Sequence, residues 1–258
     1  MIGLNTEKLI DRLDTLLKPL CELVAEDLSL LAHLNDKEPD AELLNRLRDN
    51  GFPDGLGLVL VGDSVPQVID LITGSLDSLP ETIDEHILDE LAADYADIYL
   101  NYGLQASPEE SVWVDDENLT CQDSMFQVRV WYEQLDLMAE NWRIRPDDHL
   151  VLQLKFLSHL FATEASESRL RQAAQFMDEH LLRWLLDFSQ RVANRCATAY
   201  FAGICMLTAI YCEELRDLIA EILDEPKPSV EEIEERMKPK RRTEEIPVSF
   251  MPGIGPAV

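Results

Sequence analysis

Positive charge is scarce in this sequence. Its 258 residues include 22 Lys and Arg against 50 Asp and Glu, which gives a formal net charge of -28. No Lys or Arg occurs between residues 49 and 128, a stretch that holds 18 acidic residues. A surface this acidic repels phosphates, which excludes nucleic acid as a partner and disfavours anionic membrane surfaces. The same field attracts cationic partners and raises their association rates at low salt.

Cysteine pairs, targeting signals and long apolar runs are also missing. The five cysteines form no C-x-x-C pair, so the sequence predicts reduced, mostly buried thiols. The first turns already carry acids and bases, unlike a signal peptide. The longest uncharged run, residues 196–212, is slightly short for a membrane span and predicts a buried core helix. We therefore expect a cytoplasmic protein that does not insert stably into membranes.

Strand patterns are nearly absent, and only residues 56–61 alternate weakly. Apolar residues instead recur at helical spacing, which predicts a long amphipathic helix over 6–34 with Pro19 as a potential kink. The same spacing predicts further helices at 40–49, 64–76, 82–102, 124–137, 146–163, 167–195 and 197–224. Residues 104–123 are predicted to form a loop. The expected fold is an all-α, single-domain helical bundle over residues 1–224.

Helix starts are assigned from capping chemistry. Asp40 is the expected N-cap of the second helix, and Pro146 is expected to open a helix as its first residue. Two pairs, Ser64 with Gln67 and Thr82 with Glu85, read as capping boxes, in which each side chain binds the backbone N–H of the other residue. Ser124 with Gln127 is expected to start the helix over 124–137.

The last segment, residues 225–258, differs from the rest. It holds six of the thirteen prolines and is nearly neutral, which predicts a flexible, charged, Pro-rich tail. One or two helical turns are expected at 231–236. The tail is either a disordered end or an arm that docks onto this chain or a partner.

Catalytic and metal-binding motifs are not found. No H-E-x-x-H pair occurs, and the glycines between residues 51 and 62 lack the Lys and Ser/Thr of a phosphate loop. Asp147, Asp148 and His149 follow Pro146, as expected at the positive end of a helix dipole. The alternative interpretation is a helical metal-dependent phosphohydrolase, although its usual His-Asp order is reversed here. We expect no catalytic residues, metal or cofactor, and therefore a binding protein.

Aromatic residues gather inside the acidic stretch. Tyr95, Tyr99 and Tyr102 share one helix face, and Trp113 follows in the predicted loop. Such a stripe usually belongs to a core. A groove of this kind rimmed by carboxylates would also suit a peptide with an apolar helix and flanking arginines.

The order of motifs is informative as a whole. The loop 107–115 reads S-P-E-E-S-V-W-V-D, residues 126–132 read F-Q-V-R-V-W-Y, residues 145–150 read R-P-D-D-H-L and residues 154–160 read L-K-F-L-S-H-L. This order resembles the TorD/DmsD family of molybdoenzyme-specific chaperones and its NarJ-related branch, the redox enzyme maturation proteins. The resemblance is clearest over residues 94–160. Arg145, Gln153 and Lys155 stand where family members often carry acids.

The resemblance implies an all-helical cytoplasmic chaperone. Its partner would be the catalytic subunit of a molybdopterin oxidoreductase, bound through the twin-arginine signal peptide and held until the cofactor is inserted. Contact with proteins of molybdenum cofactor biosynthesis is also implied. The expected signal-peptide-binding residues are Tyr95, Tyr99, Pro108, Glu109, Glu110, Ser111, Trp113, Pro146, Asp147, Asp148 and His149. Asp115 and Asp116 are further candidates for meeting the arginines.

Two other readings stay open at this point. One is the phosphohydrolase centred on Asp147, Asp148 and His149. The other is a generic acidic scaffold whose charge only keeps it soluble. The sequence names neither the client oxidoreductase nor the choice between a monomer and a helix-swapped dimer.

Overall fold

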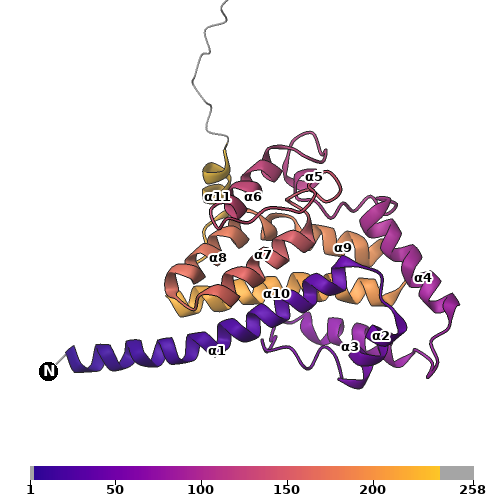
Figure 1. Cartoon of the computed structure of the whole chain (residues 1–258), viewed down its shortest axis with the longest axis horizontal. Coiled ribbons are helices and arrows are strands. Elements are labelled where there is room, and N and C mark those ends of the chain that lie inside the picture. Colours follow the sequence, from indigo (N-terminus) through magenta and orange to yellow (C-terminus); the bar gives the residue numbers. More distant parts are fainter. Residues whose placement is uncertain (1–2, 239–258) are drawn as a thin grey trace, which may run out of the picture.

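Helices make up all the regular structure in residues 3–238, the part of the chain that the computed structural model describes; side chains are described from residue 16 onward (Figure 1). The all-α prediction is confirmed. The elements are α1 (Gly3–Asp36), α2 (Ala41–Asp49), α3 (Val65–Asp77), α4 (Glu85–Tyr95), the π-turn η1 (Ala96–Leu100), α5 (Ser111–Val114), α6 (Asp123–Glu133), α7 (Leu150–Thr163), α8 (Glu167–Glu179), the 3-10 turn η2 (Leu181–Arg183), α9 (Leu185–Arg195), α10 (Ala199–Leu223) and α11 (Val230–Met237).

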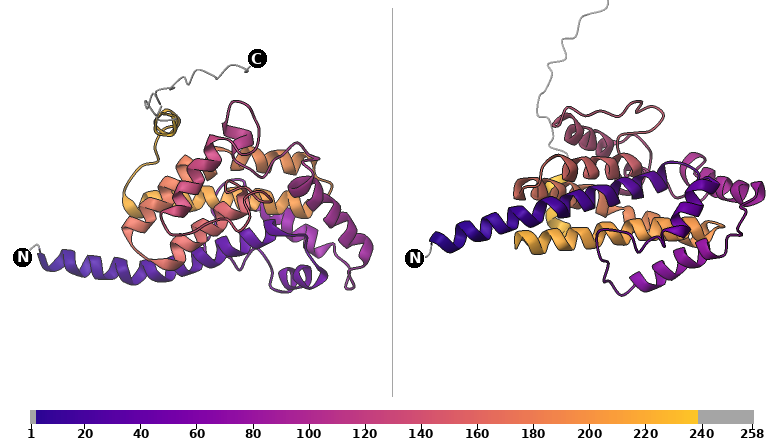
Figure 2. Two further views of the ribbon diagram at one scale, coloured as in Figure 1. Left: turned by 45° about the horizontal axis from the view of Figure 1, so that its top comes forward. Right: turned by 60° about the horizontal axis from the view of Figure 1, so that its bottom comes forward.

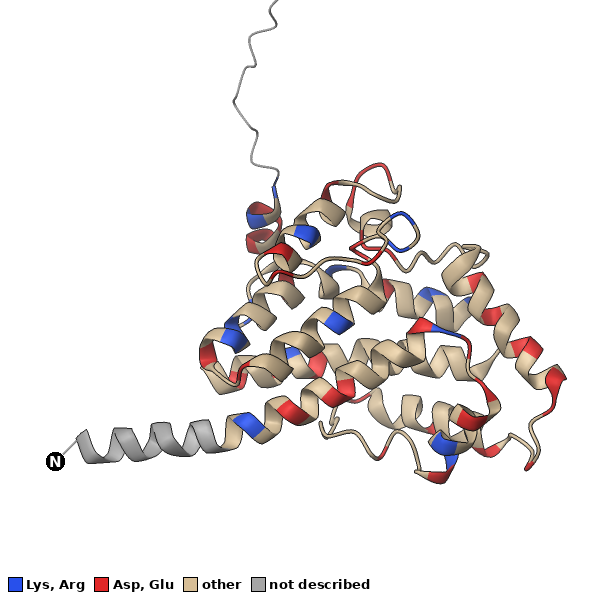
Figure 3. Ribbon diagram, in the orientation of Figure 1, with Lys and Arg blue, Asp and Glu red and all other residues tan. Residues whose placement is uncertain are grey.

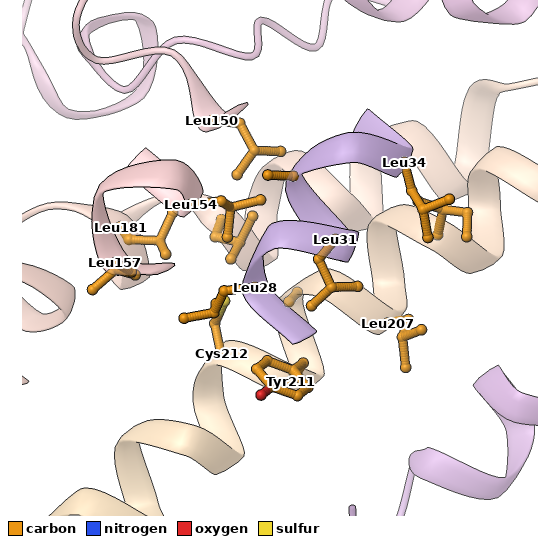
Figure 4. Close-up of a cluster of buried hydrophobic side chains, with 14 of the residues drawn as sticks. Leu28, Leu31, Leu34, Leu150, Leu154, Leu157, Leu181, Leu207, Tyr211 and Cys212 are labelled. Atoms are coloured by element: carbon orange, nitrogen blue, oxygen red, sulfur yellow. The ribbon is translucent and has the colours of Figure 1, made fainter. Parts of the chain in front are cut away.

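Helix α10 is the centre of the bundle. It packs against α1, α3, α8 and α9, while α1 also lies along α7 (Figures 1 and 2). Leucines of α1 and α7 meet side chains of α10 in a continuous apolar core (Figure 4). The core residues drawn there include Leu28, Leu31, Leu34, Leu150, Leu154, Leu157, Leu181, Leu207, Tyr211 and Cys212.

The uncharged run 196–212 forms most of the first half of α10. Phe201, Ile204, Cys205 and Tyr211 are fully buried within it, which confirms the predicted core helix. None of the described helices combines the length and the apolarity that crossing a membrane requires.

The predicted capping boxes are wrong in detail. Ser64 precedes α3, but its backbone is already helical (φ -88°, ψ -11°), and its side chain makes no capping bond. Helix α4 begins after Asp84, which has extended backbone angles and accepts from Ile87 N at 3.1 Å, so Thr82 is not the cap. Ser124 lies inside α6 and donates to Asp115 instead. An N-cap needs extended backbone angles, which residue spacing does not report.

Several predicted boundaries also shift. The helix expected from Pro146 begins at Leu150, with His149 as its N-cap. The predicted loop 104–123 contains the short helix α5, and the helix expected over 167–195 breaks at His180, where φ is -127° and ψ is -80°. At this break the buried His180 ring contacts the carboxylate of Glu110, which directly precedes α5. The break is therefore linked to a contact between residues that are far apart in the sequence.

Helix α11 lies within the predicted tail. It opens with a capping box between Ser229 and Glu232 and includes the expected turns at 231–236. The remainder of the predicted tail, residues 239–258, lies outside the described residues.

The close approach of α3 and α10 depends on Gly203. A Cβ there would lie 2.4 Å from Ile72 Cγ1, whereas a Cβ on Gly74 of α3 would meet nothing within 4 Å. We expect Gly203→Ala to lower the free energy of unfolding by about 1–3 kcal/mol, because α3 must shift. Gly74→Ala should change it by less than about 1 kcal/mol, in the stabilising direction. Urea denaturation of the two variants measures both; equal effects would contradict the close packing.

Candidate functional site

Two loops that are far apart in the sequence form a short backbone bridge. Glu110 N donates to Asp148 O at 3.2 Å, and Leu150 N donates to Pro108 O at 2.8 Å. Glu109 and His149 thereby face each other as an isolated antiparallel pair. The structure thus brings the loop 107–115 and the P-D-D-H segment together, and we call this contact the loop junction.

Asp148 holds the first turn of α5. Its Oδ2 accepts from Ser111 N at 2.8 Å and from Ser111 Oγ at 2.5 Å, and both residues are fully buried. Burial raises the pKa of Asp148 to about 6, although the bonds from Ser111 oppose the shift. Asp148 therefore acts as a structural link between the two loops.

Glu110 ties the loop junction to the helical bundle. It accepts from Gln153 Nε2 of α7 at 2.7 Å, and its Oε1 lies 3.0 Å from His180 Nδ1. Arg183 of η2 lies 3.9 Å from the same oxygen. Because Glu110 is fully buried, truncating it would leave these partners unsatisfied in the core.

Glu109 sits at the outer side of the junction but is also buried. It accepts from Ser107 Oγ and, at 3.1 Å, from Tyr102 OH. Burial raises the pKa of Glu109 to about 7, and the nearby Asp148 adds to the rise. The carboxyl is therefore close to half protonated near neutral pH.

Asp147 is paired with a cation of its own chain. Arg129 of α6 donates to Asp147 Oδ2 through Nε at 3.0 Å and Nη2 at 2.7 Å. The guanidinium also lies about 5 Å from the ring centres of Phe126 and Trp142. This buried acid is not available to a ligand while the pair is intact.

His149 caps α7. Its Nδ1 accepts from Val151 N at 3.1 Å, and burial lowers its pKa to about 3, with a smaller contribution from Arg145. Asp147, Asp148 and His149 therefore turn to three separate partners and form no common centre. Among the side chains that the structure describes, no group of three His, Cys, Asp or Glu is arranged to hold a metal ion.

Tyr95 and Tyr99 belong to the core. Their rings stack with centres 5.0 Å apart, and their hydroxyls donate to Asp36 O at 2.6 Å and Asn35 Oδ1 at 2.5 Å. Both side chains are buried against α1 and Phe201. They anchor the end of α4 and η1 and do not line an open groove.

Trp113 links the junction to the surface. Its Nε1 donates to Ser107 O at 2.8 Å, and Arg191 lies 4.2 Å above its ring. Beside it is a cavity of about 540 Å³, lined on the side of the bundle by Val114, Leu182 and Arg183 and on the other side by the segment around α11. Among the residues that line this cavity, the sequence analysis named Trp113 as a candidate. It did not name Leu182 and Arg183, because no local sequence pattern links η2 to α5.

The face around α6 is apolar and partly acidic. Phe126, Val130, Trp142 and Ile144 are exposed on α6 and the loop that follows it, and we call them the α6 strip. Asp116 and Glu117 are exposed in the preceding loop, where Figure 3 shows a run of acidic residues. Asp123 at the start of α6 is exposed as well, whereas Glu109, Glu110, Asp147 and Asp148 are buried.

The fold and the junction define a class: an all-α protein in which buried polar side chains hold two loops against a helical core and leave a cavity of mixed apolar and charged lining beside them. A protein-family model described as "Nitrate reductase delta subunit" matches residues 66–190, which include both loops.

Curated relatives agree with that match. The chain is 25% identical over 204 residues to "Chaperone protein TorD" of Vibrio vulnificus, covering 76% of this chain and 94% of the relative. It is 28% identical over 144 residues to the protein of the same name from Vibrio cholerae, covering 53% and 65%. A third, from Shewanella loihica, is 26% identical over 199 residues, covering 72% and 90%. These comparisons support a likeness to the TorD- and NarJ-related chaperones, and the relatives are named as chaperones.

The raised pKa of Glu109 predicts a pH dependence of stability. Between its ordinary value of 4.5 and about 7, the folded state holds a proton that the unfolded state has released. Stability therefore falls as pH rises through this window, by up to about 1.4 kcal/mol per pH unit. We expect Glu109→Gln to make the decline shallower between pH 5 and 7, as measured by urea denaturation at several pH values.

The matched control is Glu117→Gln, which removes the same formal charge from an exposed loop position. It should leave the slope unchanged. An equal change of slope in both variants would show that general charge repulsion, and not the burial of Glu109, determines the dependence.

Proposed function

We propose that this chain is a cytoplasmic chaperone for the catalytic subunit of a molybdopterin oxidoreductase. It binds the twin-arginine signal peptide and the apo form of that subunit, assists cofactor insertion and prevents premature export. The observation that carries the proposal is the loop junction, in which the two segments of the family-like pattern meet and place Trp113 beside a cavity with both apolar and charged lining. The chaperone relatives support the same conclusion.

In this proposal the expected site residues divide into two roles. Pro108, Ser111, Pro146, Asp148 and His149 are buried and fix the relative position of the loops. Glu109, Glu110 and Asp147 share this positioning role, and Tyr95 and Tyr99 hold the adjoining η1 in the core. Trp113 and the exposed acids next to it then form the surface that meets the peptide.

Two forces act on the leader. Its arginines are attracted by exposed carboxylates, of which each close pair adds roughly 0.2–1 kcal/mol. Its apolar segment supplies most of the affinity, because burying apolar surface away from water contributes roughly 25 cal/mol per Å² of buried area. An amphipathic helix laid into a groove is a common way to combine both.

The first test uses the leader peptide of the molybdoenzyme subunit encoded nearest to this chain, titrated by calorimetry. We expect binding that weakens as salt rises and when both arginines are changed to glutamine. Changing both to lysine, which keeps the charge, should cost less. Binding that ignores both salt and the arginines would contradict the electrostatic part of the proposal.

A second test locates the apolar contact. Val114→Glu combined with Leu182→Glu puts two charges into the cavity beside Trp113 and should weaken leader binding at least tenfold, because a buried unpaired charge is costly. Phe126→Glu combined with Val130→Glu adds the same charge to the α6 strip and is the control. If only the α6 strip variant loses affinity, the contact lies on that strip and not in the cavity.

A further inference from the structure

The end of the described chain folds back over the cavity beside Trp113. Asp224 adopts a left-handed conformation (φ 52°, ψ 37°) that ends α10, and Glu225 pairs with Arg171 at 2.8 Å. Pro228, Val230 and Ile233 then form the outer wall of the cavity. The chain therefore covers the part of the surface to which we assign the leader.

A two-carboxylate contact holds this segment on the bundle. Lys227 Nζ lies 2.7 Å from Asp217 Oδ1 and 3.4 Å from Glu213 Oε2, both on α10. At the far end, Gln127 Nε2 of α6 donates to Met237 O at 3.5 Å. The ammonium group thus occupies a receptor for a cation at the edge of the cavity beside Trp113.

The segment fits its seat loosely. The structure describes every residue of α11, and none of them is buried. The segment lines one side of the open cavity of about 540 Å³, and Figure 2 shows α11 set off from the bundle at the end of an extended strap. Its polar contacts are exposed or partly exposed pairs of the kind that contribute little. A better-fitting helix could therefore displace it.

The order of two features in the segment matches that of the proposed ligand, while the other positions of α11 are mostly glutamates. A cation, Lys227, comes first, and a helix follows whose half-buried residues Ile233 and Met237 lie four positions apart on one face. A twin-arginine leader likewise places cations before an apolar segment. The same receptor would accept either in the same direction.

We infer that residues 225–238 are an internal competitor for the leader: Lys227 occupies the arginine receptor of Asp217 and Glu213, and α11 covers the cavity lined by Trp113, Val114 and Leu182. The inference rests on the proposed function and adds to it the receptor carboxylates and a mechanism that limits affinity. Because the bound leader must replace the segment, the apparent Kd rises in inverse proportion to the fraction of time that the segment is unseated.

The experiment compares leader binding by the full chain with two shortened chains. One ends after Asp224 and lacks the whole competitor; the other ends after Lys238 and keeps it. For a segment that covers the cavity nine-tenths of the time, the chain ending at 224 should bind the leader with a Kd about tenfold lower than the full chain. The chain ending at 238 should keep the Kd of the full chain. Circular dichroism and thermal melting establish that each chain is folded.

Point variants keep the test valid if the shorter chain does not fold. Lys227→Gln combined with Ile233→Glu should loosen the competitor in the full chain and lower Kd in the same direction. Asp217→Asn combined with Glu213→Gln in the chain ending at 224 should raise Kd and reduce its salt dependence, because the arginine receptor is removed. A synthetic peptide of residues 225–238 should compete with the leader for the shortened chain, and a scrambled peptide should not.

The outcomes separate this inference from the function itself. Equal leader affinity in the full chain, the chain ending at 224 and the point variant would overturn the competitor while leaving the chaperone function in place. A gain that appears already in the chain ending at 238 would assign the effect to later residues and overturn the role of α11. Failure of every folded form to bind the leader would overturn the proposed function.

Discussion

The contact between the loops at 107–111 and 146–150 organises this molecule. Two backbone hydrogen bonds set their register, and the buried carboxylates of Glu110 and Asp148 then bind partners on α5, α7 and the turn at His180. Buried carboxylates are tolerated only where hydrogen bonds satisfy them, so each partner has to be in place together. The break between α8 and α9, the cap of α7 and the position of Trp113 all depend on this arrangement.

This dependence explains why residues that look like ligands in the sequence are structural here. A carboxylate beside a Pro or Ser in a loop resembles a binding residue, and its spacing gives no information on burial. Asp147 illustrates the point, because its partner Arg129 lies on another helix. The surface that is left for a ligand consists of less conspicuous side chains, such as Val114 and Leu182, next to the single conspicuous one, Trp113.

The helices themselves were largely predictable, since apolar periodicity reports directly on burial. Helix α1 and the buried run in α10 follow the pattern closely. What failed depended on contacts between distant residues. Ser64 does precede α3 but makes no capping bond, and α4 starts after Asp84 instead of Thr82. The helix predicted over 167–195 breaks at His180, whose ring contacts Glu110. The resemblance named the two loops as a binding site, which stays a prediction, while the geometry separates their buried residues from their exposed ones.

The Arg129–Asp147 pair has a further consequence for the charge of the molecule. Arg48 and Arg129 are the two cations that border the acidic stretch, and neither offsets its exposed acids: Arg48 donates to the carbonyls of Leu79 and Pro80, and Arg129 is bound to a buried carboxylate. The negative potential over α3 and α4 is therefore balanced by ions from solution. In this sense dissolved counterions are a component of the folded state, and the ionic strength of the medium determines both how firmly these helices hold together and how far away a cationic segment is attracted.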